Sequence, residues 1–209
     1  MKKNRHINKV AVIGSGIMGS RIACHFANIG VKVLLLDIIP FDLTEEQLKD
    51  KKLRNSIVND ALKSTLKSNP SPIYSKKFIN RITTGNIDDD LQKITEVDWI
   101  IEVVIERLDI KKQVFEKIEK FRKKGTIISS NTSGIPIESI IDGRSEDFKA
   151  NFCGTHFFNP PRYLKLLEII PSSKTDPNVT EFLMNYGDKY LGKDMVLCKD
   201  TPAFIANRI

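Results

Sequence analysis

The 209-residue sequence has only three cysteines and no apolar run long enough to span a membrane. Cys24, Cys153 and Cys198 are far apart and odd in number, so they match neither a disulfide framework nor a zinc site. This usage is typical of a reducing compartment, and we expect a cytoplasmic protein with no membrane partner. The apolar run after the basic N-terminal residues is too short for a signal peptide.

Other signatures of function are missing as well. The sequence contains no Walker loop, no nucleophile elbow and no cluster of metal ligands, so we predict no metal site. Basic residues number 33 against 26 acidic ones, which gives a net charge of +7, but no compact basic run is interleaved with aromatic residues. We therefore expect this charge to meet a polyanionic small molecule and no nucleic acid.

The most informative stretch lies near the N-terminus. An apolar run at 10–13 predicts a buried strand, and residues 14–19 follow at once with the pattern G-x-G-x-x-G. Apolar residues at helical spacing then run to Gly30, and a second apolar run, 31–36, ends in Asp37. The order strand, glycine loop, helix, strand and acid predicts a dinucleotide-binding βαβ unit. The alternative is a glycine-rich turn in some other α/β domain.

Each glycine of the loop has a physical purpose. Gly14 allows the tight turn, Gly16 lets a pyrophosphate approach the backbone, and Gly19 lets the helix pack closely on the strand. Asp37 lies 18 positions after Gly19, where its carboxylate would accept from the adenosine 2′-hydroxyl and repel a 2′-phosphate. No arginine follows Asp37, so we expect NAD rather than NADP as the cofactor.

A lysine-rich helical arm is predicted after the second strand, at about 44–80. Its main helix runs to about residue 68, where Asn69-Pro70 breaks it, and a further helix follows at 75–79. The lysines are either a solvated surface or a cationic arm for a phosphate-bearing substrate, and the sequence leaves both open. They are Lys49, Lys51, Lys52, Lys63 and Lys67.

The rest of the chain alternates strands and helices, which predicts a Rossmann-type, doubly wound and mostly parallel sheet over residues 1–200. Expected strands lie at 81–84, 97–104, 126–130, 152–158, 164–170 and 194–198, with longer helices at 109–121 and 176–191. A new apolar helix opens at Thr201-Pro202 and has no room to finish, so we expect a fragment of a longer protein.

Ligands bind beyond the carboxyl ends of the strands in such sheets, so polar residues expected there are the candidate site. His156 titrates near neutrality, as a proton-transfer partner for hydride chemistry must. Glu168 lies in an apolar strand and needs a partner if it is buried, and His156 is the candidate if the two strands form a hairpin. Glu168 would then fix the imidazole tautomer. The alternative is a solvent-facing strand residue.

Ser133 suits a hydroxyl donor to a carbonyl or a cofactor, and Glu102, in mid-strand, has no assigned role.

Six segments together point to one family: VAVIGSGIMGSRIA, LLLD, VVIERLDIKKQVFEKIE, ISSNTSGIPI, GTHFFNPPRYLKLLEII and KDTPAFIANRI. Through them the sequence resembles the NAD-binding part of the 3-hydroxyacyl-CoA dehydrogenases nearly end to end. The resemblance implies that His156 takes the hydroxyl proton while hydride leaves C3 for NAD, and that Glu168 orients it. It also implies that Ser133 and Asn159 hold the substrate oxygen and the nicotinamide side, and that Asn207 completes the pocket.

The resemblance further implies contacts to NAD from Asp37, Glu106 and Lys111, and from the backbone around Ile17 and Met18. It places the lysine-rich arm near the phosphates of an acyl-CoA substrate. In the family an all-helical domain follows, closes the site and supplies the dimer contact, so residues 201–209 are expected to be its truncated start and a homo-oligomer is possible through it.

The function expected from the resemblance is NAD-dependent oxidation of (3S)-3-hydroxyacyl-CoA to 3-oxoacyl-CoA in fatty-acid β-oxidation. Two alternatives stay open: a dehydrogenase of a related small hydroxy acid, and an NAD-binding fragment without turnover. One departure from the family is Pro160-Pro161-Arg162 after Asn159, where a single proline is common, and this change could alter the acyl pocket.

Overall fold

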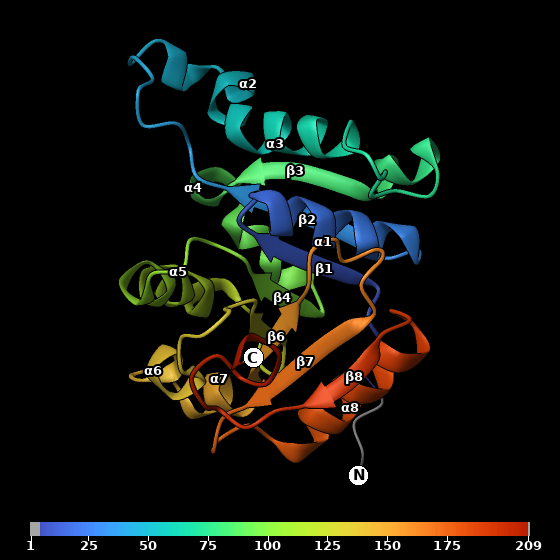
Figure 1. Ribbon diagram of the computed structural model, residues 1–209. Coiled ribbons are helices and arrows are strands. Elements are labelled where there is room, and N and C mark those ends of the chain that lie inside the picture. The colour runs from blue at the N-terminus through green and yellow to red at the C-terminus, as the bar shows by residue number, and fades with distance from the viewer. Residues whose placement is uncertain (1–4, 209) are drawn as a thin grey trace.

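The computed structural model describes residues 5–208, which form an eight-stranded sheet with helices on both faces (Figure 1). The strands are β1 Lys9–Ile13, β2 Lys32–Asp37, β3 Ile82–Asn86, β4 Trp99–Glu102, β5 Ile127–Ser130, β6 Phe152–Phe157, β7 Leu166–Pro171 and β8 Asp194–Leu197. Their order is β3-β2-β1-β4-β5-β6-β7-β8, and every neighbouring pair is parallel except β6 with β7. The predicted Rossmann-type, doubly wound, mostly parallel sheet is confirmed.

Helices cover both faces of this sheet because its strands are apolar on both sides. The α-helices are α1 Ile17–Asn28, α2 Lys51–Arg54, α3 Ser56–Leu66, α4 Ile87–Asp90, α5 Leu108–Phe121, α6 Ile137–Ile141, α7 Glu146–Ala150 and α8 Pro177–Lys189. Short 3₁₀ helices are η1 Gln47–Lys49, η2 Lys76–Arg81, η3 Leu91–Glu96 and η4 Ala206–Arg208.

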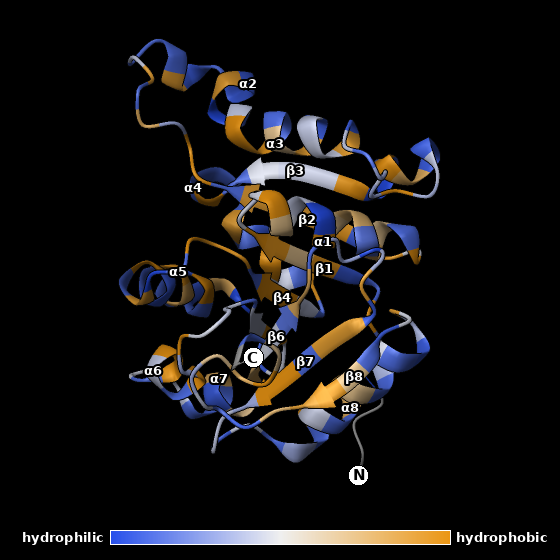
Figure 2. Ribbon diagram, viewed as in Figure 1, coloured by the Kyte–Doolittle hydropathy of each residue, from blue (hydrophilic) through white to orange (hydrophobic). Residues whose placement is uncertain are grey.

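Two hydrophobic cores result, one on each face of the sheet. Buried residues of α1, α3 and α8 pack on one face, and those of α4, α5, α6 and α7 pack on the other. Figure 2 shows the matching pattern, with hydrophobic strands such as β7 and β8 and mostly hydrophilic colouring on the outer helices. Trp99 anchors the first core, where its ring meets Phe26 and Tyr186 edge-on and its indole N–H donates to Ser129 Oγ at 2.9 Å.

The strand order reverses at β1, because β2 and β3 lie on one side of it and β4 on the other. The carboxyl ends of β1 and β4 therefore form the crevice in which doubly wound folds bind ligands. The glycine loop lies here. Gly14 has a φ of 102°, and a Cβ at this position would lie 2.6 Å from the Val103 carbonyl oxygen.

The predicted long helix of the arm is wrong. The arm is divided into η1, α2 and α3, and α3 lies over β3 at the edge of the sheet (Figure 1). Asp50 has extended backbone angles and its side chain caps α2 by accepting from the Lys52 N–H at 2.7 Å. Such local side-chain bonds compete with helix continuation. The helix expected at 75–79 is the 3₁₀ helix η2.

The helix expected to open at Thr201-Pro202 is also wrong for the residues that the structure describes. Ala203 and Phe204 have φ values of 61° and 51°, in the left-handed region that ends a helix. The segment forms turns and then η4. Helix α7 was not expected, although Ser145 followed by two acids is a helix start. The Ser145 hydroxyl caps α7 by accepting from the Phe148 N–H.

The glycine loop gives a test of the close packing of α1 on β1. A Cβ added at Gly19 would lie 1.9 Å from the Gly14 carbonyl oxygen, whereas one added at Gly16 would meet nothing within 4 Å. Gly19→Ala should therefore lower the free energy of unfolding by about 2 kcal/mol or more through overpacking. The matched variant Gly16→Ala should cost less than about 1 kcal/mol, because alanine is only a poorer N-cap. Urea denaturation measures both, and equal losses would contradict the predicted close contact.

Candidate active site

His156 and Glu168 form a buried pair on neighbouring strands. They stand directly opposite each other in the antiparallel register of β6 and β7, and His156 Nδ1 lies 2.7 Å from Glu168 Oε2. The two residues are 5% and 1% exposed. The structure therefore brings together the two residues whose pairing was expected from a hairpin, and the solvent-facing alternative for Glu168 does not hold.

The second oxygen of Glu168 is held by the C-terminal segment. Glu168 Oε1 accepts from the backbone N–H groups of Ile205 at 3.2 Å and Ala206 at 2.9 Å. Burial acts to raise the pKa of Glu168, but the hydrogen bonds from His156, Ala206 and Ile205 outweigh it, so this pKa lies below its ordinary value. The carboxylate is thus held ionised beside the imidazole.

Aromatic rings surround the imidazole of His156. The Phe158 ring lies 4.4 Å away, centroid to centroid, and the Phe204 ring meets it edge-on at 5.9 Å. Phe204 is only 1% exposed, and its left-handed backbone conformation turns the chain back over β7. These contacts exclude water from one side of the imidazole and limit its rotation.

The start of α1 fits the phosphates of a dinucleotide. Gly16 caps this helix without any side-chain hydrogen bond, the first turn has no acid, and Ile17 is 68% exposed. Backbone N–H groups and the positive end of the helix dipole therefore face open space over Gly16. Asp37 lies beside the loop, where its Oδ2 accepts from both the Ser15 N–H and the Ser15 hydroxyl at 2.5 Å. These residues fit the dinucleotide that the sequence predicts.

Asn159 lies on a loop that two basic residues hold. Arg21 of α1 donates to Asn159 Oδ1 at 2.5 Å, which ties the loop after His156 to the glycine-loop helix. Lys193 donates to the carbonyl oxygens of Pro161 and Leu164 from below. Burial lowers the pKa of Lys193 to about 8. Neither basic residue was expected at the site, because neither belongs to a local motif.

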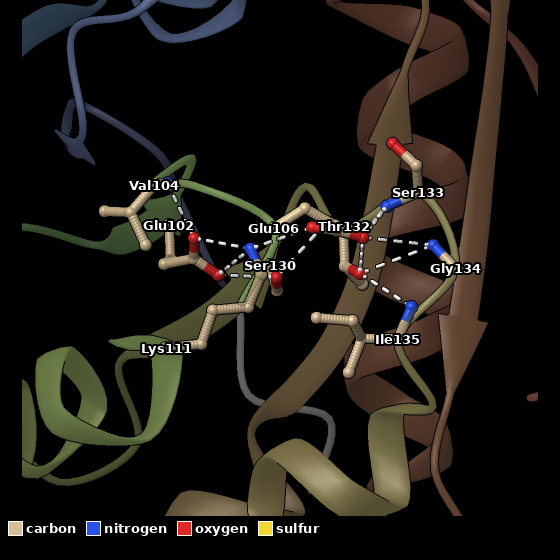
Figure 3. A network of polar contacts seen from close by, with 9 residues as sticks. All are labelled: Glu102, Val104, Glu106, Lys111, Ser130, Thr132, Ser133, Gly134 and Ile135. Carbon is tan, nitrogen blue, oxygen red and sulfur yellow. Dashed lines mark hydrogen bonds and ion pairs between the residues drawn. The ribbon is translucent and has the colours of Figure 1, made fainter. Parts of the chain in front are cut away.

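Ser133 lies in a loop that Glu106 holds (Figure 3). Glu106 Oε1 accepts from the Thr132 hydroxyl at 2.6 Å and from the N–H groups of Ser133 at 2.8 Å and Gly134 at 3.2 Å. The Asn207 side-chain amide donates to the Ser133 carbonyl oxygen at 3.3 Å. The structure thus brings Glu106, Ser133 and Asn207 together, as expected for residues of one pocket.

Lys111 differs from the other predicted cofactor contacts because its side chain is 1% exposed. Its ammonium group lies 2.8 Å from Glu102 and 3.3 Å from Glu106, so two carboxylates already engage it. A direct contact between Lys111 and NAD stays a prediction. Glu102 was placed in mid-strand without a role, and an acid within an apolar predicted strand, nine residues before a lysine of the next predicted helix, was the available signal.

These groups meet at the carboxyl edge of the sheet, where an ordered imidazole backed by a carboxylate lies near a dinucleotide-binding loop. Comparison with known proteins then decides the family. The sequence matches the family model of the 3-hydroxyacyl-CoA dehydrogenase NAD-binding domain over residues 9–201. The chain belongs to this family. The predicted family, and with it the NAD-binding domain, is confirmed.

Similar sequences carry consistent names. The chain is 54% identical over 212 residues to a probable 3-hydroxyacyl-CoA dehydrogenase of Bacillus subtilis, covering 99% of this chain and 27% of the relative. It is 34% identical to the mitochondrial hydroxyacyl-coenzyme A dehydrogenase of Sus scrofa, covering 97% of this chain and 62% of that one. The chain thus spans about a quarter of the first relative and less than two thirds of the second.

Solved structures agree with this assignment. An (S)-3-hydroxybutyryl-CoA dehydrogenase from Ralstonia eutropha superposes with a TM-score of 0.75 at 26% identity, over 98% of this chain and 68% of that one. A 3-hydroxybutyryl-CoA dehydrogenase from Escherichia coli gives a TM-score of 0.74 at 30% identity, over 97% of this chain and 40% of that one. Within residues 5–208, no helix is long and apolar enough to cross a membrane.

The depressed pKa of Glu168 predicts a pH-dependent contribution to stability. Ionised Glu168 stabilises the fold above its ordinary pKa of 4.5, and this contribution is lost as the pH falls through the lower folded-state pKa. Glu168→Gln lacks the contribution, so the free energies of unfolding of wild type and variant should converge as the pH falls from about 6 to about 3. Urea denaturation across this range measures the gap, and a gap independent of pH would contradict the prediction.

Proposed function

We propose that the chain is the NAD-binding and proton-transferring part of an enzyme that oxidises (3S)-3-hydroxyacyl-CoA to 3-oxoacyl-CoA in fatty-acid β-oxidation. The observation that carries the proposal is the buried His156–Glu168 pair at the same sheet edge as the glycine loop. A general base must have its tautomer fixed and must face the proton that it accepts, and this pair supplies the first requirement.

The proposed role of His156 follows from its bond to Glu168. If Nδ1–H donates to the carboxylate, Nε2 carries no proton and can accept the proton of the substrate 3-hydroxyl group. The ionised Glu168 then stabilises the imidazolium that forms. Ser133 and Asn159 are proposed to hold the substrate oxygen and the nicotinamide side, with Asn207 completing the pocket. One positioned base contributes about 10²–10⁴-fold to such a reaction.

The proposed cofactor site uses the backbone of the glycine loop at Gly16, Ile17 and Met18. Asp37 is proposed to accept from the adenosine ribose, and the exposed side chain of Glu106 is proposed to contact the cofactor. NAD, when bound, supplies the acceptor for the hydride that leaves C3 of the substrate. The chain's own residues bind it, orient it and hold the proton.

Acyl-CoA is the proposed partner, and the arm supports it. The five lysines predicted to form a cationic surface are all exposed, and none of them lies in the hydrophobic core. Exposed lysines attract phosphates, although they are equally typical of a solvated surface. A homo-oligomer, a cytoplasmic location and a helical domain beginning at residues 201–209 stay predictions.

The alternative is a unit that holds NAD without turnover. The chain spans 27% of the Bacillus relative and 56% of a probable 3-hydroxyacyl-CoA dehydrogenase of Deinococcus radiodurans, so the activity of the whole protein is a proposal for this chain. Loss of NADH absorbance with acetoacetyl-CoA separates the two readings. Turnover supports the enzyme, whereas normal NADH binding without turnover supports the alternative. A dehydrogenase of a small hydroxy acid would act equally well on the substrate without CoA.

The role of His156 predicts a separation of chemistry from cofactor binding. His156→Gln keeps a similar volume but cannot accept the proton, so turnover of acetoacetyl-CoA should fall by about 10²–10⁴-fold. The dissociation constant for NADH should stay within about twofold, or 0.4 kcal/mol. Steady-state kinetics and fluorescence titration measure the two quantities. Equal loss of both would refute the assigned role, and wild-type turnover in the variant would refute it as well.

The role of Asp37 predicts a change in cofactor preference. Asp37→Asn removes the charge that repels a 2′-phosphate, so the affinity for NADPH relative to NADH should rise by about tenfold, or 1.4 kcal/mol. Asp42→Asn is the matched control, because Asp42 is exposed on the following segment and should leave the ratio unchanged. Titration with both cofactors measures the ratio, and an equal change in the two variants would contradict the prediction.

A further inference from the structure

A buried ion pair lies beside the Ser133 loop (Figure 3), and apart from the predicted contact of Lys111 with NAD neither of its residues has a role so far. Glu102 at the end of β4 is 0% exposed, and Lys111 in α5 is 1% exposed. The ammonium group donates to both carboxylate oxygens, at 2.8 Å and 3.1 Å. Burying two charges is costly even when they are paired, and apolar residues of the same volume would often be at least as stable. The pair therefore calls for an explanation beyond stability.

Glu102 has its hydrogen-bonding capacity filled. Besides Lys111, its carboxylate accepts from the Ser130 hydroxyl at 2.6 Å and from the Val104 N–H at 2.7 Å. Its own carbonyl oxygen accepts from the Asn131 N–H at 2.8 Å. Val104 and Asn131 lie at the beginning of the loops that follow β4 and β5, and Ser130 is the last residue of β5. Glu102 thus fixes where both loops leave the sheet.

Lys111 extends this network toward the pocket. Its ammonium group lies 3.3 Å from Glu106 Oε2, while Glu106 Oε1 holds the Thr132 hydroxyl and the N–H groups of Ser133 and Gly134. The Glu106 side chain is 42% exposed, so water and ligands reach it, but Lys111 is not exposed. Glu106 therefore connects the buried pair to the Ser133 loop, because its Oε2 lies near Lys111 and its Oε1 accepts from the loop.

The contacts that Glu106 makes to Lys111 and to the loop depend on charge. One ammonium group serves two carboxylates, and a lysine suits this because it carries three rotatable donors on a flexible stem. Burial acts to raise the pKa of Glu106, but the bonds from Thr132, Lys111 and Ser133 together lower it below its ordinary value. Glu106 is thus ionised when it holds the loop, and an ionised acceptor makes the stronger bonds to the backbone N–H groups.

We propose that Glu102 and Lys111 are positioning residues that act through Glu106 to hold the loop Thr132–Ile135, and with it Ser133, in place for the reaction. The catalytic consequence rests on the proposed function. The anchoring of the loop does not, because it is a property of the hydrogen bonds at the Ser133 and Gly134 N–H groups.

The test compares Lys111→Met with the double variant Glu102→Gln/Lys111→Met. The single variant leaves Glu102 buried without its cation, so its Tm should fall by roughly 10 °C. The double variant removes both charges and should recover most of this loss. In both variants the Ser133 and Gly134 amides should exchange with solvent at least about tenfold faster, and kcat with acetoacetyl-CoA should fall by about 10²-fold, because a small displacement of a positioning group is enough.

Lys112→Met is the matched control. Lys112 is the next residue in α5, and it forms only an exposed ion pair with Asp142 at 3.2 Å. This variant should leave Tm, the exchange of the two amides and kcat unchanged, since exposed pairs contribute little.

Each outcome decides the proposal. The proposal is supported if the double variant recovers its Tm while its Ser133 and Gly134 amides still exchange fast and its kcat stays low. If the pair were purely structural, recovery of Tm would restore wild-type amide exchange and kcat as well. Wild-type exchange and kcat in the stable double variant would overturn it, and fast exchange with unchanged kcat would overturn its catalytic part. If the wild-type chain itself shows no turnover, the proposed function fails while the amide exchange still decides whether the pair anchors the loop.

Discussion

The close contact between the glycine loop and its neighbours is the constraint on which the rest of this structure depends. Gly19 has no room for a Cβ against the Gly14 carbonyl oxygen, and Gly14 in turn packs on the Val103 carbonyl oxygen. Backbone therefore lies on backbone at the point where the strand order reverses. This packing brings the start of α1 to the ends of β1 and β4, so that phosphate-binding N–H groups and the groups that follow β4 share one crevice.

The antiparallel pairing of β6 with β7 positions the candidate base and its acid. It sets His156 directly opposite Glu168. A shift of the register by one residue would place the two side chains on opposite faces of the sheet. The C-terminal segment then supplies two N–H groups to the free oxygen of Glu168 and packs Phe204 on the imidazole. The pair is thus oriented by three separate parts of the chain, β6, β7 and the residues after β8.

Charged side chains recur at this edge of the sheet, and each has a different set of donors. Glu168 is ionised beside His156, Glu106 is ionised beside the Ser133 loop, and Glu102 is paired with Lys111 in the interior. Stability alone would favour apolar residues at the buried positions of Glu168, Glu102 and Lys111. The concentration of these charges near the carboxyl ends of the strands is what the proposed proton transfer and cofactor binding would require.

The sequence by itself determined the alternation of strands and helices, the glycine loop with Asp37, and the identity of His156 as the candidate base, because these depend on periodicity and on local motifs. It missed the division of the arm at Asp50 and the turn at Ala203, which are local backbone conformations that the apolar periodicity does not mark. It also missed the contacts of Arg21 and Lys193, whose partners lie far along the chain. Only the tertiary structure decided that Lys111 lies beneath the pocket with Glu102, since burial and long-range pairing are properties of the packed sheet and leave no periodic signal in the sequence.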